Sequence, residues 1–122
     1  MSAPNLILTN SIVGNTTFFI ANGVSSQAMA NVVSNSAGSN QSIKLNTITI
    51  ANPNAVNVPF SVDVLRLGTG NYLAANVTVP GNSTMVVQAK DTAIYLIEGD
   101  TLRCNVGAAY TCHFTVSYEV IS

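Results

Sequence analysis

Two cysteines and one histidine are the side chains of this sequence best suited to redox, metal or proton-transfer chemistry. Cys104 and Cys112 lie eight residues apart, and His113 follows the second cysteine directly. The chain has no other cysteine or histidine, so it cannot supply the four Cys or His ligands of a structural zinc site. If residues 107–109 form a hairpin loop, Cys104 faces Cys112 and a cross-strand disulfide is conceivable. We favour two buried thiols, which suit a protein made in a reducing cytosol.

His113 is the one candidate for an imidazole general base. Alternation along a strand turns it away from both cysteines, which argues against a shared metal site. Nucleophilic catalysis would also need a Ser or Cys nucleophile and an orienting carboxylate. The chain has no G-x-S-x-G motif. We therefore expect a surface histidine, no enzyme activity, no bound metal and no cofactor.

Three carboxylates, Asp91, Glu98 and Asp100, lie close together in the sequence. Such a group suggests either a paired-carboxylate acid–base site or a calcium site. A paired-carboxylate site should come with an aromatic-lined cleft, and the chain has no tryptophan. We favour ordinary turn chemistry, with Asp91 pairing with Lys90 or Arg103.

The amino-acid composition favours a structural protein that packs into an assembly over an enzyme. Charged residues make up 7% of the chain, against about 25% in an average soluble domain. Asn, Ser and Thr replace them, so copies of this surface repel one another only weakly. A net charge of −1 and a pI of about 5.5 argue against binding to a nucleic-acid backbone.

The length of 122 residues predicts one domain, 1–122, with a hydrophobic core of its own. No apolar run reaches the roughly 18 residues of a membrane-spanning helix. The opening residues, Met1 to Asn5, lack the basic and apolar regions of a signal peptide. We expect synthesis in a cytoplasm without secretion, and no contact with a membrane.

Short runs rich in Val, Ile, Thr, Phe and Tyr alternate with clusters of Gly, Asn, Ser and Pro, which predicts an all-β fold. Ten strands at this spacing favour an antiparallel β-sandwich that resembles a jelly roll. Residues 1–14 are expected to form an N-terminal arm or edge strand, and 23–41 a polar loop. The predicted strands are 5–13, 16–22, 28–34, 42–51, 58–67, 71–79, 83–89, 93–97, 100–106 and 111–121.

Two segments carry a more specific expectation. In 42–51 the apolar residues change phase between Leu45 and Ile48, which indicates either a β-bulge near Asn46–Thr47 or burial of both faces. The uncharged run 16–21 contains Phe18 and Phe19, whose side chains must point to opposite faces. That strand is therefore either central in a sheet or an edge covered by another subunit.

Eight blocks of the chain, taken in their order and spacing, form a pattern: they are 3–5, 11–14, 43–48, 50–52, 79–87, 90–91, 94–103 and 116–122. This pattern resembles a family of small structural proteins in the virions of tailed phages, especially phages of cyanobacteria. The sequence departs from the family pattern mainly in residues 15–41 and in the cysteine pair.

The resemblance implies a virion component without catalytic residues. We expect a capsid decoration (cement) protein, assembled in the host cytoplasm, that binds the major capsid protein and itself, as a trimer. Its expected assembly contacts are Pro4, Asn5, Leu6, Phe18 and Phe19. The alternatives are a neck, baseplate or fibre-attachment component, or a host-facing carbohydrate-binding module that uses Tyr72, Tyr95 and Tyr110.

Overall fold

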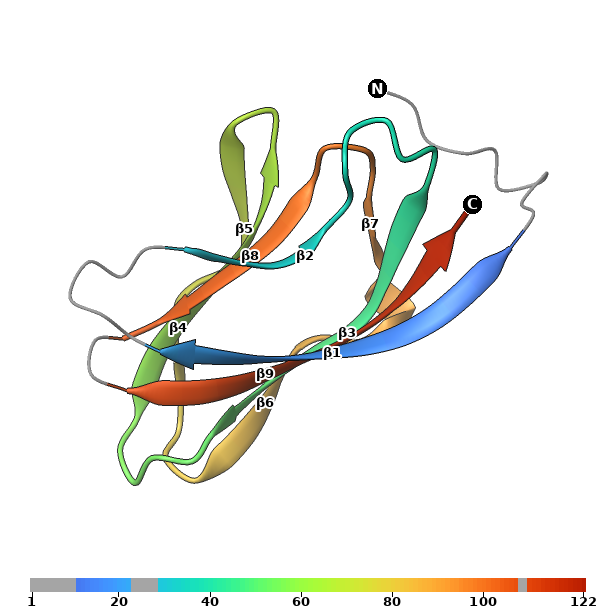
Figure 1. Cartoon of the computed structure of the whole chain (residues 1–122). Coiled ribbons are helices and arrows are strands. Elements are labelled where there is room, and N and C mark those ends of the chain that lie inside the picture. Colours follow the sequence, from blue (N-terminus) through green and yellow to red (C-terminus); the bar gives the residue numbers. More distant parts are fainter. Residues whose placement is uncertain (1–10, 23–28, 108–109) are drawn as a thin grey trace.

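A computed structural model describes residues 11–22, 29–107 and 110–122, and within them the chain forms two antiparallel sheets (Figure 1). The all-β sandwich predicted from the sequence is confirmed. Among these residues no helix is long and apolar enough to cross a membrane. The first sheet contains β1 (Ile12–Asn22), β9 (Thr111–Ile121), β3 (Ser42–Asn52), β6 (Ser83–Gln88) and β7 (Ile94–Leu96). The second contains β2 (Ala30–Ser34), β8 (Thr101–Val106), β4 (Val58–Arg66) and β5 (Thr69–Val79).

The order of the strands is that of a jelly roll. The first sheet runs β1-β9-β3-β6, with β7 also paired to β3, and the second runs β2-β8-β4-β5. Strands from the two ends of the chain therefore lie side by side, while β1, β2, β3 and β4 alternate between the sheets. This wrapped arrangement packs one inner face against the other (Figure 1).

Strand boundaries differ from the prediction near the N-terminus. One strand, β1, joins the expected strand 16–22 to residues 12–13 of the expected strand 5–13, because Gly14 and Asn15 continue the ladder opposite Glu119 and Tyr118. Residues 1–10 lie outside the described residues. The expected polar loop 23–41 is not one loop, since residues 30–34 form β2 against β8.

The core lies between the inner faces of the two sheets and is built by period-two alternation. In β9, Cys112, Phe114 and Val116 are buried, while His113 is exposed. Phe114 meets Phe60 of the opposite sheet edge to face, with ring centroids 6.2 Å apart. Of the two alternatives for residues 42–51, the structure shows the β-bulge: the register of β3 against β9 shifts between Leu45 and Thr47. Leu45 and Ile48 are both buried as a result.

The predicted hairpin that joins the cysteines is wrong. β8 pairs with β2 and β4, whereas β9 pairs with β1 and β3, so Cys104 and Cys112 belong to opposite sheets. The chain changes sheet after β8, where the Gly107 amide donates to the Pro59 carbonyl at 2.8 Å. Alternation placed both thiols on inward faces correctly, but it carries no information about which strands are neighbours.

Candidate assembly surface

The edge strand β1 is the most unusual surface of this molecule. Its eleven residues pair with β9 in one unbroken register, from Ile12 opposite Ile121 to Asn22 opposite Thr111. No described strand pairs with its other side. The strand contains no charged residue and no proline. A long, regular, uncharged edge is what monomeric β proteins normally avoid, because it invites another strand to pair.

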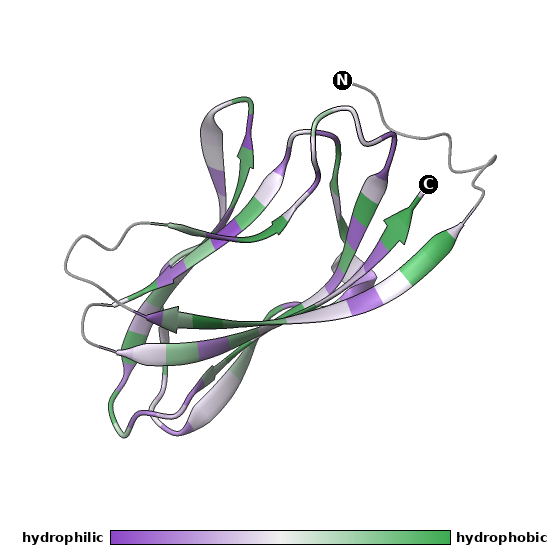
Figure 2. Cartoon of the chain, viewed as in Figure 1, coloured by the Kyte–Doolittle hydropathy of each residue, from purple (hydrophilic) through white to green (hydrophobic). Residues whose placement is uncertain are grey.

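Alternation in β1 separates the two adjacent phenylalanines. Phe19 points inward and packs against the core, whereas Phe18 points outward and is 78% exposed. Ile20, on the same outward side, is 55% exposed. Figure 2 shows green, apolar segments toward both ends of β1, with a paler stretch between them. Of the five expected contact residues, Phe18 is therefore exposed and available to a partner, whereas Phe19 packs against the core. The other three, Pro4, Asn5 and Leu6, lie outside the described residues.

Part of the outer face of the first sheet continues this surface without charged side chains, and the Lys44–Glu119 ion pair lies farther along the same face. Phe18 aligns with Thr115 of β9, Thr115 with Thr49 of β3, and Thr49 with Val86 of β6. In the next row His113 is exposed and lies between Ile20 and Ala51. Neither neighbour can orient an imidazole as a general base, so this face has the character of a contact surface.

The two thiols are free and buried. Burial raises the pKa of Cys104 from 9.0 to about 12, and it raises the pKa of Cys112 as well. A buried thiol that stays protonated is a poor nucleophile and a poor metal ligand. Neither cysteine reaches a neighbouring molecule while the sandwich is intact, so both act as small apolar core residues.

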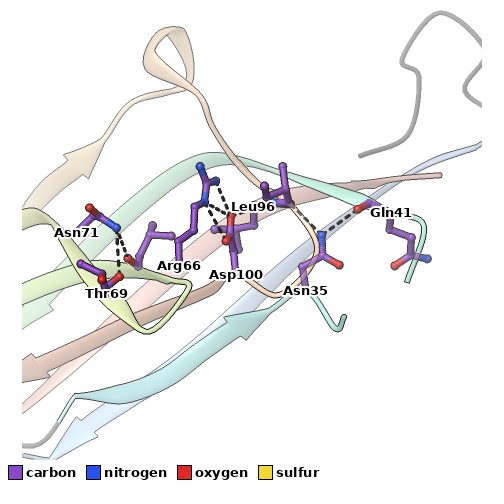
Figure 3. Close-up of polar contacts among 9 residues, drawn as sticks. Asn35, Gln41, Arg66, Thr69, Asn71, Leu96 and Asp100 are labelled. Atoms are coloured by element: carbon purple, nitrogen blue, oxygen red, sulfur yellow. Dashed lines mark hydrogen bonds and ion pairs between the residues drawn. The ribbon is translucent and has the colours of Figure 1, made fainter. Parts of the chain in front are cut away.

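The three neighbouring carboxylates do not form a metal or acid–base site. Asp100, just before β8, is held by Arg66 at the end of β4 with contacts of 2.6 to 3.0 Å (Figure 3). Glu98 accepts a hydrogen bond from the Asn40 amide, and Asp91 lies exposed in a 3₁₀ turn, Lys90–Thr92. Among the described residues no group of three or more His, Cys, Asp or Glu could hold a metal ion.

The network around Asp100 joins loops from both sheets. The Asp100 carboxylate also accepts from the Ile97 amide, and its carbonyl accepts from the Asn35 amide. The Asn35 side chain donates in turn to the carbonyls of Gln41 and Leu96, both at 2.9 Å (Figure 3). These bonds satisfy buried polar groups at the end of the sandwich, and so identify Asp100 as a structural residue.

A second ion pair lies on the second sheet, where Arg103 of β8 donates to Asp63 of β4 at 2.6 and 2.9 Å. Asp63 is only 2% exposed, and a Cβ at Gly70 would collide with the pair, so β5 covers it closely. The expected pairing of Asp91 with Arg103 is therefore wrong, because Arg103 pairs with Asp63. The hydrogen-bonded carboxylates raise the pKa of both Arg66 and Arg103. Ion pairs thus occupy Arg66, Arg103 and also Lys44, which leaves little charge for an outside partner.

The tip of the β4–β5 hairpin carries an exposed apolar residue in a strained conformation. Leu67 and Gly68 form a two-residue turn, and both have positive φ, +52° and +77°. The Leu67 side chain is 83% exposed. A turn of this type favours Asn at its first position, so the leucine does not stabilise the turn. Its exposed side chain is a second candidate for contact with a partner.

The tyrosines expected to stack on sugars are not grouped into one platform. Tyr72 and Tyr95 are exposed, whereas Tyr110 packs against the core. Tyr95 borders a hollow of about 380 Å³ that Arg66 and Asn71 also line. The apolar side chains of Val64, Leu73 and Ile94 complete it.

No family profile and no curated protein matches this chain. The chain is similar to a solved structure from the Bacillus endospore appendages, which are described as a novel family of disulfide-linked pili. The TM-score is 0.52 at 11% identity, and the match covers 99% of this chain and 95% of that one. At this identity the likeness extends to the fold alone.

Proposed function

We propose that this protein is a structural component of a phage virion, and specifically a capsid decoration protein. The observation that carries the proposal is the long, uncharged, apolar edge β1 with Phe18 and Ile20 on its outer side. The resemblance of its sequence blocks to small virion proteins supplies the setting. Among the residues that the structure describes, the two thiols are buried, and Asp63 and Asp100 are paired with arginines, which fits a structural role.

The mechanism is stabilisation by binding to the assembled state alone. A protein that binds the outer surface of a completed shell, and bridges neighbouring capsomers, lowers the free energy of that shell and of no dissociated subunit. An apolar, weakly charged surface suits this task because its binding energy depends little on salt. The partners are the major capsid protein and further copies of this chain, in the virion.

Copy number tests the proposal directly. Quantitative mass spectrometry of purified particles would compare this protein with the major capsid protein. A ratio near parity, or a simple large fraction of it, is expected for a decoration protein. A trace ratio matching a single vertex would contradict decoration and favour the neck, baseplate or fibres.

The N-terminal segment is the second contact that we assign to the capsid. Deleting residues 2–10 is expected to weaken co-sedimentation with capsids, because the segment directly precedes the exposed β1 edge. The control is Asp91→Asn in the full-length chain, at an exposed position of the Lys90–Thr92 turn that is not assigned to any contact. Unchanged capsid binding after the deletion would remove residues 2–10 from the interface.

A carbohydrate-binding role is the second candidate, and the hollow beside Tyr95 favours it. Asn71 and Arg66 place polar side chains there, next to an exposed aromatic ring and an apolar floor. A glycan array with the purified protein tests this role, with Tyr95→Ala as the matched variant. Binding lost in that variant would support it, and an array without hits would exclude it.

A further inference from the structure

We propose that β1 pairs with β1 of a second copy, antiparallel and about a two-fold axis, so that the first sheets of two molecules join into one continuous sheet. The inference goes beyond the proposed function, since it concerns the purified chain alone. A two-fold contact predicts dimers, or assemblies built from dimers, and not the trimer that we expected from the sequence.

The first step of the argument is that β1 needs cover. Each exposed edge strand leaves alternate amide and carbonyl groups directed at solvent, ready to pair with another strand. Proteins protect such edges with charge, proline, bulges or short length. β1 has none of these protections: it has eleven residues in unbroken register and no charged side chain or proline.

The second step is that no other described edge matches β1. The opposite edge of the first sheet is broken into β6 and β7, of six and three residues, with the 3₁₀ turn between them. In the second sheet β2 has five residues and a register shift. β5 is long, but Asn76 has φ of +49° and its register against β4 shifts twice.

The third step follows from symmetry. A head-to-tail contact needs two different complementary edges, whereas a two-fold contact needs one edge that complements itself. Among the described strands only β1 is long and regular enough to pair along its whole length, so its best partner is another β1. With full overlap, Ile12 meets Asn22 of the other copy, Thr17 meets Thr17, and the two Phe18 rings lie diagonally across the axis.

Sedimentation velocity of the purified full-length chain over a concentration series tests the pairing. We expect a monomer–dimer equilibrium that Phe18→Lys shifts to monomer, because two like charges would then meet near the axis. The matched control is Val86→Lys, on the same outer face but the opposite edge, 62% exposed. It should leave the dimer intact. Equal loss in both variants, no loss in either, or a trimer would overturn the proposal.

A cysteine crosslink tests the register and detects a weak dimer. Directly opposed Cβ atoms lie about 4.5–5.5 Å apart across an antiparallel pair, so Thr17→Cys should give a covalent dimer on oxidation. Asn22→Cys should not, because the two copies of residue 22 are about 30 Å apart at the strand rise. The wild-type chain controls for the buried native thiols and should stay monomeric in the gel. A crosslink in Asn22→Cys but not in Thr17→Cys would overturn the full-overlap pairing.

Discussion

Asp100 is 1% exposed, yet its carboxylate accepts hydrogen bonds from two groups, the Arg66 guanidinium and the Ile97 amide. A carboxylate removed from water to this degree is stable only with such partners. The same holds for Asp63 beside Arg103. Asp100 therefore fixes the geometry of a loop, whereas Asp63 links strands β4 and β8, and both charges are neutralised by arginines of the same chain.

Asp100→Asn tests that role, because it keeps the shape of the side chain and removes its charge. We expect the free energy of unfolding to fall by about 1–3 kcal/mol, the usual cost of breaking a charged hydrogen-bond group. Urea denaturation measures it. Asp91→Asn, at an exposed position of the neighbouring turn, is the control and should stay within about 0.5 kcal/mol of wild type. Equal effects of the two substitutions would contradict the structural role.

Cys104 predicts a loss of stability in alkali. Its pKa is about 12 in the folded chain and 9.0 without burial, so the folded state keeps a proton that the unfolded state releases. The stabilising contribution is complete below 9.0 and disappears as the pH rises toward about 12. The slope is up to about 1.4 kcal/mol per pH unit. Unfolding measured across this range should show it.

Other groups also titrate in alkali, so the comparison variant is Cys104→Val, which fills similar volume without an ionisable group. Its unfolding free energy should fall less steeply with pH than that of the wild type. Parallel curves for the two proteins would mean that the Cys104 thiol does not contribute.

At the scale of single elements, the residue at the first position of the β4–β5 turn does not suit the backbone conformation of that turn. Two consecutive positive φ angles at Leu67 and Gly68 are the geometry of a type I′ hairpin turn. Gly68 suits it, but leucine in the left-handed region costs about 1–2 kcal/mol. The exposed side chain makes no compensating core contact.

Leu67→Asn should therefore raise the free energy of unfolding by about 1 kcal/mol, because asparagine adopts the left-handed region readily. The thermal midpoint, measured by calorimetry, checks it. Leu67→Ala separates conformation from side-chain exposure and should give little gain. A drop in stability for Leu67→Asn would show that the leucine side chain supports the fold.

Features of the strands could be predicted from the sequence where they depend on neighbouring residues in the chain. The phase change between Leu45 and Ile48 limited the interpretations of β3 to a bulge or burial of both faces. The structure has the bulge, which keeps both residues on one buried face. The adjacent Phe18 and Phe19 had to take opposite faces. The separation of β8 and β9 into opposite sheets was not predictable in this way, since Cys104 and Cys112 would be buried with any strand neighbours.

At the scale of the whole molecule, contacts between the sheets hold the sandwich together. Phe60 of β4 and Phe114 of β9 meet across the core. Phe114→Ala should lower the free energy of unfolding by about 3–5 kcal/mol, through lost burial and the cavity left behind. Chemical denaturation measures it. Phe18→Ala, at low protein concentration, is the control and should change it by about 0.5 kcal/mol or less. A small effect of Phe114→Ala would contradict close packing there.

The sequence predicted the sandwich but not which strand lies at an edge. The uncharged run 16–21 was compatible with a central strand or a covered edge, because both demand the same alternation. The position of β1 follows from the pairing of β9 with β3 on its other side, a contact between residues far apart in the chain. Long-range neighbours of this kind leave no local signature, so the edge position of β1 emerged only from the structure.

The beginning and the end of the described chain are joined by backbone hydrogen bonds, from the Ser11 amide to the Ser122 carbonyl and from the Ser122 amide to the Ser11 carbonyl. The fold is therefore nearly a closed loop. A linker that joins residue 122 to the native first residue would keep residues 1–10 and permit circular permutation, with new termini opened at the exposed Leu67–Gly68 tip. Peptides fused to those new ends would project from the hairpin tip and leave the β1 edge clear.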